Sequence, residues 1–306
     1  MAHYNVEQLD TVVVEPTPRI DSLDLMSPFV WPEGDGYRAM VRGVPRPLGP
    51  KDPTGIVLGG YSRDGLRFVM DAGLAITPGP TPDDAGGCED PTVLKTDTGY
   101  LVYYTGVDAA RRQGALIVAS GPDLQSLTKY ELMLKAPPGE GNIKEATLAQ
   151  TPSGDWRLFY EYAAKEHGGD GHKRIAASRV GMARGPTAEG PWKVMPDPFG
   201  IRDDSWDNWH LSTGPMTMSV GQDPVMFYNG ATVDARWRIG WISFDPEFTR
   251  VTGRGLEPLL VPPPATDRAS TDIAFAASTV MEGDRIALYY SLEDRLLRRA
   301  LIRRTA

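Results

Sequence analysis

The sequence contains a single cysteine, Cys88, among 306 residues. An internal disulfide and a multi-cysteine metal site are therefore excluded. Long apolar runs are also missing, because no stretch approaches the roughly 20 residues needed to span a bilayer. The N-terminus lacks the basic-then-apolar pattern of a secretory signal. We therefore expect a cytoplasmic protein with no membrane partner.

Basic residues are in the minority, with 32 Lys and Arg against 40 Asp and Glu and a net charge of -8. Nucleic acids and anionic membranes both require a basic surface, so neither is expected as a partner. The composition is otherwise ordinary for a globular protein, at 41% hydrophobic and 24% charged residues. We expect one domain, residues 1–306, with a large buried core.

Helix signals are scarce, because 33 Gly and 27 Pro interrupt nearly every window of the sequence. Short runs rich in Val, Ile, Tyr, Trp and Phe recur instead. Five of these runs share the alternation and the flanking turn residues of β-strands. They are YRAMVRG (37–43), YLVYYTG (100–106), WRLFYEY (156–162), PVMFYNG (224–230) and RIALYYS (285–291).

A second element precedes each of these strands by a constant offset. Counting back 14 residues from Val41, Tyr104, Tyr160, Tyr228 and Tyr290 gives Ser27, Asp90, Ala146, Gly214 and Ala276. The matched strand residues are separated by 63, 56, 68 and 62 positions. Repeats of this length, each with about four short antiparallel strands, are typical of β-propeller blades. A β-sandwich is the alternative, but the repeated offset disfavours it.

We therefore predict an all-β fold, a five-bladed β-propeller. The blades are placed at about 25–80, 86–137, 142–197, 208–262 and 270–304, with the N-terminal residues as a candidate for closing the last blade. The residues that open the inner strands should then meet at one end of the central channel. They are Ser27, Glu89, Asp90, Lys144, Glu145, Ser212, Thr213 and Asp272. A hollow with several convergent polar groups is a candidate binding site.

Several motifs, taken in order, resemble those of glycoside hydrolase family 130, the five-bladed propellers that include mannoside phosphorylases and β-mannosidases. They are CEDPTV before YYTG, NIKEATLA before WRLFYEY, WHLSTGPM before MFYNGA, and STVMEGDRIALYYSLED. The resemblance extends from about Ser27 to Leu301. It implies that Asp90 is the general acid and that Arg42 and Asp294 bind the sugar at the cleaved position. It also implies that Lys144 and Arg112 hold phosphate in a phosphorylase.

The chain departs from the phosphorylase pattern at three positions. Thr92 stands where the phosphorylases have Arg, and Tyr160 and Glu161 stand where they have a His-Arg pair. A carboxylate in place of a cation repels phosphate, so we favour hydrolysis and keep inorganic phosphate as an alternative co-substrate. In an inverting hydrolase a second carboxylate, roughly 6.5–9.5 Å from the acid, activates water. Glu161 or Glu145 could serve as this base.

The remaining expectations concern the surroundings of Asp90. As a general acid, Asp90 would need burial or a close negative neighbour such as Glu89 to raise its pKa. Tyr160, His210 and Asp272 are expected to contact the substrate. The polar loop HGGDGHKR at 167–174 is expected to shape substrate access, without a metal. The expected partner is a small oligosaccharide or glycoside, with no cofactor, and a homo-oligomer is left open. The alternative function is a non-catalytic or repurposed propeller that binds a glycan or another small molecule.

Overall fold

A computed structural model describes residues 3–137, 141–167, 174–219, 221–267 and 271–305, without the side chains of 165–176. Nearly all of the regular structure is β-strand. The two helical elements are single 3-10 turns, η1 (Ile20–Ser22) and η2 (Ala265–Asp267). Within the described ranges, no helix has the length and apolar character required to cross a membrane.

The described strands form five hydrogen-bonded sheets. The first has the order β2 (Val13–Val14), β6 (Arg67–Ile76), β5 (Ile56–Ser62), β4 (Gly36–Pro45), β3 (Leu23–Glu33). The second has the order β10 (Thr128–Leu134), β9 (Gly114–Gly121), β8 (Gly99–Val107), β7 (Gly87–Thr96). The third begins with β11 (Ile143–Gln150), β12 (Trp156–His167), β13 (Arg174–Gly185), and β14 (Lys193–Met195) also pairs with β13.

The third sheet continues through a single parallel bridge into β15 (His210–Ser212), β18 (Asn229–Ala231) and β19 (Arg238–Ile239). The fourth sheet has the order β16 (Met216–Thr217), β17 (Val225–Met226), β20 (Ile242–Phe244), β21 (Val251–Arg254). The last has the order β1 (His3–Thr11), β24 (Leu296–Thr305), β23 (Arg285–Leu292), β22 (Ala274–Glu282).

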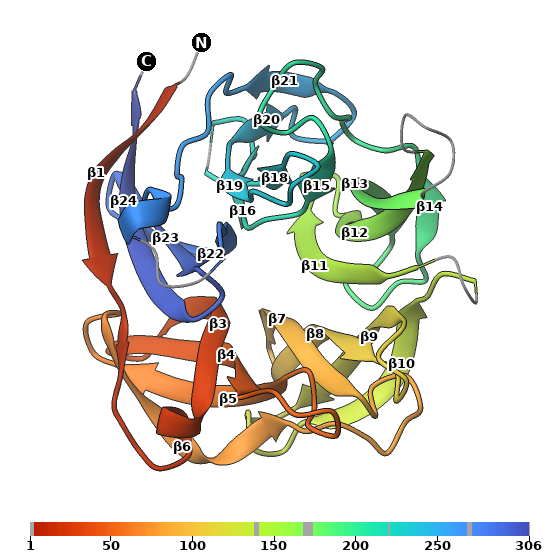
Figure 1. Ribbon diagram of the computed structural model, residues 1–306. Helices are drawn as coiled ribbons and strands as arrows, with labels where there is room; N and C mark the ends of the chain where they lie inside the picture. Colours follow the sequence, from red (N-terminus) through yellow and green to blue (C-terminus); the bar gives the residue numbers. More distant parts are fainter. Residues whose placement is uncertain (1–2, 138–140, 168–173, 220, 268–270, 306) are drawn as a thin grey trace.

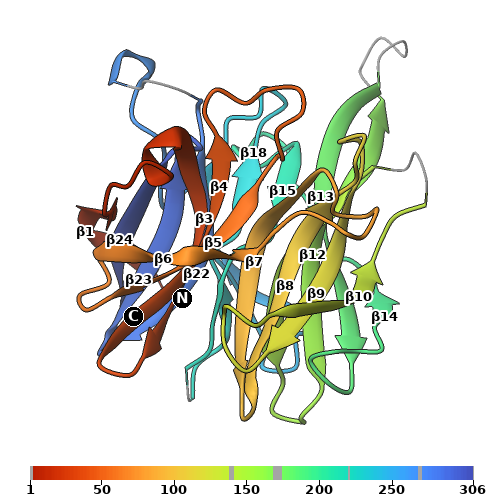
Figure 2. The ribbon, with the colours of Figure 1, turned by 90° about the horizontal axis from the view of Figure 1, so that it is seen from below.

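The sheets stand around a common axis, with β3, β7, β11, β16 and β22 nearest to it (Figure 1). In the perpendicular view, neighbouring sheets lie side by side and their loops gather at the two ends (Figure 2). These views and the almost complete absence of helix in the described residues confirm the all-β class and the propeller arrangement. The count of five separate blades is not confirmed, because the bridge between Ser178 and His210 joins strands of two predicted blades into one sheet.

The core is divided into layers between neighbouring sheets. One cluster packs Met40 and Val57 of the first sheet against Tyr104 of the second. The next packs Tyr103 of the second sheet against Leu158 of the third. Further clusters fill the remaining spaces around the ring. This packing explains the sequence of β8, GYLVYYTGV, which is buried on both faces because it lies between two layers.

A set of side-chain hydrogen bonds joins the inner strands, together with Gly214 before β16 and Asn229 of β18, around the axis. The bonds run from Ser27 Oγ to Asp90 Oδ1 (2.6 Å), Thr92 Oγ1 to Ala146 O (2.6 Å), Thr147 Oγ1 to Gly214 O (3.0 Å), Asn229 Nδ2 to Ala276 O (3.3 Å) and Ser278 Oγ to Pro28 O (2.7 Å). The circle therefore closes through short polar side chains. Beneath them lies a cavity of about 110 Å³ lined by residues of the same inner strands, including Phe29, Thr92, Thr147, Met216 and Thr279.

Asn229 tests the importance of this circle for stability. Its side chain is fully buried, donates to Thr213 O (2.6 Å) and accepts from the Ala276 N–H (2.7 Å). We expect Asn229→Ala to lower the free energy of unfolding by at least about 2 kcal/mol, because each buried group left without a partner costs about 1–3 kcal/mol. Urea denaturation measures the loss. Asn5→Ala, which removes an exposed amide, is the control, and an equal effect of both variants would contradict the prediction.

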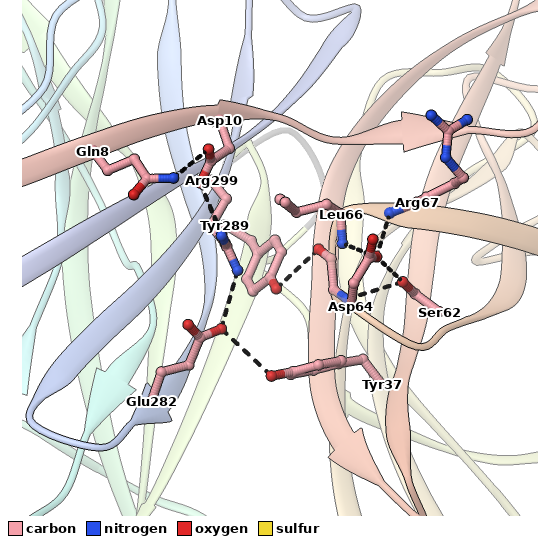
Figure 3. A network of polar contacts seen from close by, with 11 residues as sticks. Gln8, Asp10, Tyr37, Ser62, Asp64, Leu66, Arg67, Glu282, Tyr289 and Arg299 are labelled. Carbon is pink, nitrogen blue, oxygen red and sulfur yellow. Dashed lines mark hydrogen bonds and ion pairs between the residues drawn. The ribbon is translucent and has the colours of Figure 1, made fainter.

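The N-terminal strand lies beside the C-terminal one, since β1 pairs antiparallel with β24. Figure 3 shows the contacts around this junction and with the neighbouring first sheet. Arg299 of β24 binds both Asp10 of β1 (2.9 Å) and Glu282 (3.1 Å). Tyr289 donates a hydrogen bond to Gly65 O (3.0 Å), across to the loop between β5 and β6. The pairing of β1 with β24 and these contacts therefore close the ring between the last sheet and the first.

Two similar buried networks lie behind the inner strands. In one, Tyr104 donates to Asp84 Oδ2 (2.8 Å), and Lys129 of β10 pairs with the same carboxylate. In the other, Tyr228 donates to Asp207 Oδ2 (2.6 Å), and Arg254 of β21 lies 2.6 Å from that oxygen. Both carboxylates are completely buried. Each network ties the loop before an inner strand to the second and outermost strands of the same predicted blade.

Candidate functional site

A β-bulge in the inner strands aims the side chains of the candidate site. Pairing with the next strand shifts by one residue between Met26 and Phe29, Glu89 and Thr92, Lys144 and Thr147, and Ala276 and Ser278. Three bulges hold a non-glycine residue at positive φ: Ser27 at 50°, Asp90 at 48° and Glu145 at 56°. This backbone is unfavourable for such residues and marks functional sites, where bulges re-aim side chains.

The bulges also correct the predicted offset of 14 residues. In the third sheet the residue at positive φ is Glu145, one position before the Ala146 that the constant offset gives. The equivalent of Asp90 in this sheet is therefore a second carboxyl group. Constant spacing along the sequence could not identify Glu145. At a bulge two residues of one strand lie opposite a single residue of the next strand, and either of the two could be the functional one.

Arg42 of β4 binds two acidic side chains of β7. Its Nη2 lies 2.7 Å from Glu89 Oε1, and its Nη1 lies 3.4 Å from Asp90 Oδ1. Nη2 also donates to Thr54 O at 3.0 Å. Burial opposes the charge of Arg42, but the surrounding carboxylates outweigh it and raise the pKa of the guanidinium. Arg42 therefore carries a permanent positive charge within the ring.

Asp90 is only 5% exposed, so its side chain does not face bulk water. Its Oδ1 accepts a hydrogen bond from Ser27 Oγ at 2.6 Å in addition to the contact with Arg42. Burial favours the neutral acid, but the positive charges of Arg42 and Lys144 and hydrogen bonds with Ser27 and Glu145 together lower the pKa of Asp90. The expectation that the surroundings of Asp90 raise its pKa is therefore wrong.

The pKa values of Glu89 and Asp294 are raised, in contrast to that of Asp90. Burial raises the pKa of Glu89, partly offset by the charge of Arg42 and reinforced by Asp90. Asp294 lies in the turn between β23 and β24 at a φ of 53°, and burial likewise raises its pKa. Arg42, Asp90 and Lys144 all act on the charge of Asp294, so the turn belongs to the same cluster.

Lys144 and Glu161 face each other on neighbouring strands. They are cross-strand partners of β11 and β12, with 3.6 Å between Lys144 Nζ and Glu161 Oε1. The Glu161 side chain is 8% exposed and that of Lys144 is 32% exposed. The charge of Glu161 raises the pKa of Lys144, against the opposing effect of burial. Glu161 is therefore the ion-pair partner of Lys144, the residue that the resemblance assigns to phosphate binding.

Glu145 lies beside Asp90, and the two carboxyl groups share a hydrogen bond. Burial and the neighbouring charges of Asp90 and Glu161 raise the pKa of Glu145 well above its usual range, against the charge of Lys144. The pKa values of the two neighbouring carboxyl groups are therefore shifted in opposite directions, upward for Glu145 and downward for Asp90.

Seven of the eleven predicted site residues are thus brought together: Arg42, Glu89, Asp90, Lys144, Glu145, Glu161 and Asp294. They come from β4, β7, β11, β12 and the turn after β23, which are far apart in the sequence. Five carboxyl groups face two cations. Among the described residues, no group of three or more His, Cys, Asp or Glu side chains has the arrangement of a metal site.

The other four predicted residues lie outside this cluster. Arg112 is exposed, and its main-chain N–H donates to Asp108 Oδ1. Tyr160 is packed in the core layer with Leu101 and Leu158, because it points to the opposite face of β12 from Glu161. This position corrects its predicted contact with the substrate.

Asp272 is paired with Arg238, at 2.6 Å, and with Arg236, at 3.8 Å. His210 lies nearer the cluster, since Lys144 and Arg179 act on its charge. Burial and these cations lower the pKa of His210, which keeps the imidazole neutral. Its Nδ1 lies 3.4 Å from Ser178 Oγ.

Cys88, which precedes Glu89, is fully buried, and burial is the main cause that raises the pKa of its thiol. The Gly-rich part of the predicted access loop, 168–173, lies outside the described residues.

Sequence reasoning missed a row of aromatic side chains near His210. The ring of Trp237 lies 5.4 Å from that of His210 and 5.2 Å from that of Phe275. Phe275 is the cross-strand partner of Ser291, whose Oγ accepts a hydrogen bond from the Ser27 N–H. Trp237 lies in an irregular segment, so no strand pattern marks it. The row therefore runs toward the side of the ring that carries Ser27 and Asp294.

Three polar atoms of the cluster are buried and, with the carboxyl groups ionised, have no hydrogen-bond partner within the described part of the chain: Arg42 Nε, Asp90 Oδ2 and Glu161 Oε2. Buried polar atoms without partners are rare, because each costs about 1–3 kcal/mol. A donor and an acceptor left open in one cluster are what a hydroxyl-bearing ligand requires.

Known structures share this architecture. A β-1,2-mannobiose phosphorylase from Listeria innocua, in complex with β-1,2-mannobiose, has a TM-score of 0.73 and 16% identity over 96% of this chain and 90% of that chain. MPT-4, a mannose phosphorylase from Leishmania mexicana in complex with phosphate, has a TM-score of 0.68 and 13% identity over 98% and 89%.

A third similar structure carries the description that the glycoside hydrolase family 130 of mannoside phosphorylases contains glycoside hydrolases that target β-1,2 mannosidic linkages in Candida mannan. It has a TM-score of 0.72 and 20% identity over 91% of this chain and 84% of that chain. No protein-family model and no curated protein matches the chain. The resemblance to glycoside hydrolase family 130 that the motifs indicate is therefore confirmed at the level of the fold.

Proposed function

We propose that the protein is an enzyme of glycoside hydrolase family 130, built as a five-bladed propeller, that hydrolyses a β-mannoside with inversion. The observation that carries this proposal is the meeting of Asp90 and Glu161, two buried carboxyl groups from different sheets, around Arg42 and Lys144. Inverting glycosidases use such a pair, one as general acid and one as general base. The five core layers and the circle of hydrogen bonds support five blades.

Asp90 is proposed as the general acid. It protonates the oxygen of the leaving sugar while the bond between that oxygen and the anomeric carbon breaks. The bond electrons remain on the leaving oxygen, which departs as a hydroxyl group. Arg42 and Asp294 would bind hydroxyl groups of the sugar at the cleaved position, since both flank Asp90.

Glu161 is proposed as the general base, acting on water. It would accept a proton from a water molecule whose oxygen forms the new bond to the anomeric carbon from the opposite face. Lys144 lies 3.6 Å away, so its positive charge faces the proposed base. Glu161 Oε2 has no other partner within the described residues and is open to accept from water.

The charge of the cluster favours water over phosphate. Two cations stand against five carboxyl groups, and each cation already contacts a glutamate, Arg42 with Glu89 and Lys144 with Glu161. A phosphate dianion in such a site would be repelled by the carboxylates, because the charge of each cation is already offset by a neighbouring glutamate. Arg112, the second predicted phosphate ligand, lies outside the cluster.

The substrate class rests on structural neighbours and on the aromatic row. One neighbour is a complex with β-1,2-mannobiose, and we propose a short β-mannoside as substrate here. Trp237, between His210 and Phe275, offers an apolar face on which a second sugar ring could stack. A protein that only binds a glycan is the alternative, and the lowered pKa of Asp90 favours it.

Incubation with β-1,2-mannobiose in phosphate-free buffer tests the proposal. We expect free mannose as the product, and addition of inorganic phosphate should not divert the product to mannose 1-phosphate. Sugar phosphate as the main product would overturn hydrolysis. Binding without any turnover, measured by calorimetry, would favour the glycan-binding alternative.

Glu161→Gln separates water from phosphate as the acceptor. We expect the variant to lose about 10²–10⁴-fold in kcat for hydrolysis, the range that general base catalysis contributes, with little change in KM. Glu189→Gln, which removes an exposed carboxylate, is the control. If Glu161→Gln retained hydrolysis, another group would have to be the base.

A further inference from the structure

The side chains of Asp90 and Glu145 are two carboxyl groups joined by a hydrogen bond. Two ionised carboxylates both accept and neither donates, so this bond requires one proton between them. Asp90 Oδ2 is buried and, with every carboxyl group ionised, receives no donor from the described residues. A proton on Glu145 supplies the missing donor.

The two halves of the pair differ in their surroundings. Asp90 Oδ1 already accepts from Ser27 (2.6 Å) and from Arg42 (3.4 Å), and such donors stabilise a carboxylate. Glu145 is surrounded by more acidic than basic groups. The charged side chains that act on the pair are Arg42 of β4, Glu89 of β7, Lys144 of β11, Glu161 of β12 and Asp294 of the turn after β23.

The main chain holds Glu145 in place for this role. Its carbonyl oxygen accepts a hydrogen bond from Thr213 Oγ1, and its N–H donates to Thr105 Oγ1 at 3.3 Å. The positive φ of 56° at Glu145 matches that of 48° at Asp90. Two bulges at equivalent positions of neighbouring inner strands thus bring the carboxyl groups together.

We propose that Asp90 and Glu145 work as one pair sharing a single proton, in which Glu145 stores the proton that Asp90 delivers to the leaving oxygen. This inference rests on the proposed function. The single proton first passes from Glu145 to Asp90, and Asp90 gives it to the leaving oxygen as the bond between that oxygen and the anomeric carbon breaks. Both carboxyl groups are then ionised, beside the cations of Arg42 and Lys144, and solvent returns one proton to the pair after release.

Infrared difference spectroscopy tests the pair without any turnover. A protonated carboxyl group has a C=O stretching band that an ionised carboxylate lacks. At neutral pH we expect such a band in the wild-type protein and its loss in Glu145→Gln. We also expect its loss in Asp90→Asn, because without the charge of Asp90 the Glu145 carboxyl ionises. Glu131→Gln, at an exposed position, should leave the band unchanged. A wild-type spectrum without a band that depends on Glu145 overturns the inference.

Kinetics with two leaving groups tests the role of the proton. Glu145→Gln should reduce kcat on β-1,2-mannobiose by about 10²-fold or more, the lower range of general acid catalysis. A dinitrophenyl β-mannoside needs no protonation of its leaving group, so its kcat should fall less than tenfold. Equal losses on both substrates would show a merely structural role and overturn the inference. If neither substrate is turned over by wild type, the proposed function fails while the infrared result still decides the pair.

Discussion

Asp90→Asn is expected to reduce turnover of β-1,2-mannobiose by about 10³-fold or more. The amide cannot deliver a proton to the leaving oxygen, and general acid catalysis contributes about 10²–10⁴-fold to such reactions. The change keeps the shape of the side chain and its hydrogen bond from Ser27. Binding of the sugar should therefore persist, so the loss should appear in kcat and not in KM. Steady-state kinetics with a mannose assay measures both constants.

Asp97→Asn is the matched control for this variant. Asp97 lies in the turn directly after β7, at the other end of the strand that begins near Asp90, and it is exposed. Its replacement should leave kcat unchanged. Full activity of Asp90→Asn would contradict the assignment of the acid, and a comparable loss in Asp97→Asn would point to general damage to the strand.

Asp207→Ala is expected to lower the free energy of unfolding by about 3–5 kcal/mol, the cost of removing one partner of a buried ion pair. Asp207 is completely buried and accepts from Tyr228 (2.6 Å), Arg254 (2.6 Å) and Arg202 (3.0 Å). Its removal leaves two guanidinium groups and a buried hydroxyl without their acceptor. Chemical denaturation followed by tryptophan fluorescence measures the loss.

The pH dependence gives this variant a second signature. Burial raises the pKa of Asp207, but its hydrogen bonds and the charge of Arg254 outweigh burial and lower the pKa. A carboxyl group with a lowered pKa stabilises the fold above its unfolded pKa of about 3.9, and this contribution is lost as the pH falls below that value. Asp207→Ala should therefore flatten the loss of stability on acidification.

Asp203→Ala controls for a change in the same loop, because Asp203 is exposed. It should shift the free energy of unfolding by less than about 0.5 kcal/mol. A loss below about 1 kcal/mol in Asp207→Ala, or equal losses in both variants, would show that the network does not stabilise the loop.

The propeller arrangement could be predicted because the same pattern of buried strand residues recurs along the chain. Each predicted blade buries both faces of its second strand, so runs such as YLVYYTG and RIALYYS recur at similar spacing. Polar residues stand at the bulges between them, and a ring brings these positions together. This is why Glu89, Asp90, Lys144 and Glu145 could be placed in one cluster from the repeat, whereas Arg42 and Asp294 were implied by the family resemblance.

The departures have physical causes that no spacing reveals. The bulge moved the functional position of the third sheet from Ala146 to Glu145, and strand alternation turned Tyr160 into the core when Glu161 faced the axis. The ionisation of Asp90 was also mispredicted. Burial or Glu89 was expected to raise its pKa, and burial does act in that direction, but Arg42 and Lys144 approach from other sheets and, with hydrogen bonds, lower it. Such charges become visible only when the ring is assembled.

The anomeric configuration of the first product tests the central proposal, that Asp90 and Glu161 hydrolyse a β-mannoside from opposite faces. Proton nuclear magnetic resonance during hydrolysis of β-1,2-mannobiose in phosphate-free buffer observes the product before it mutarotates. We expect α-mannose from the cleaved residue to appear first. Initial release of β-mannose, or no turnover without phosphate, would contradict the account.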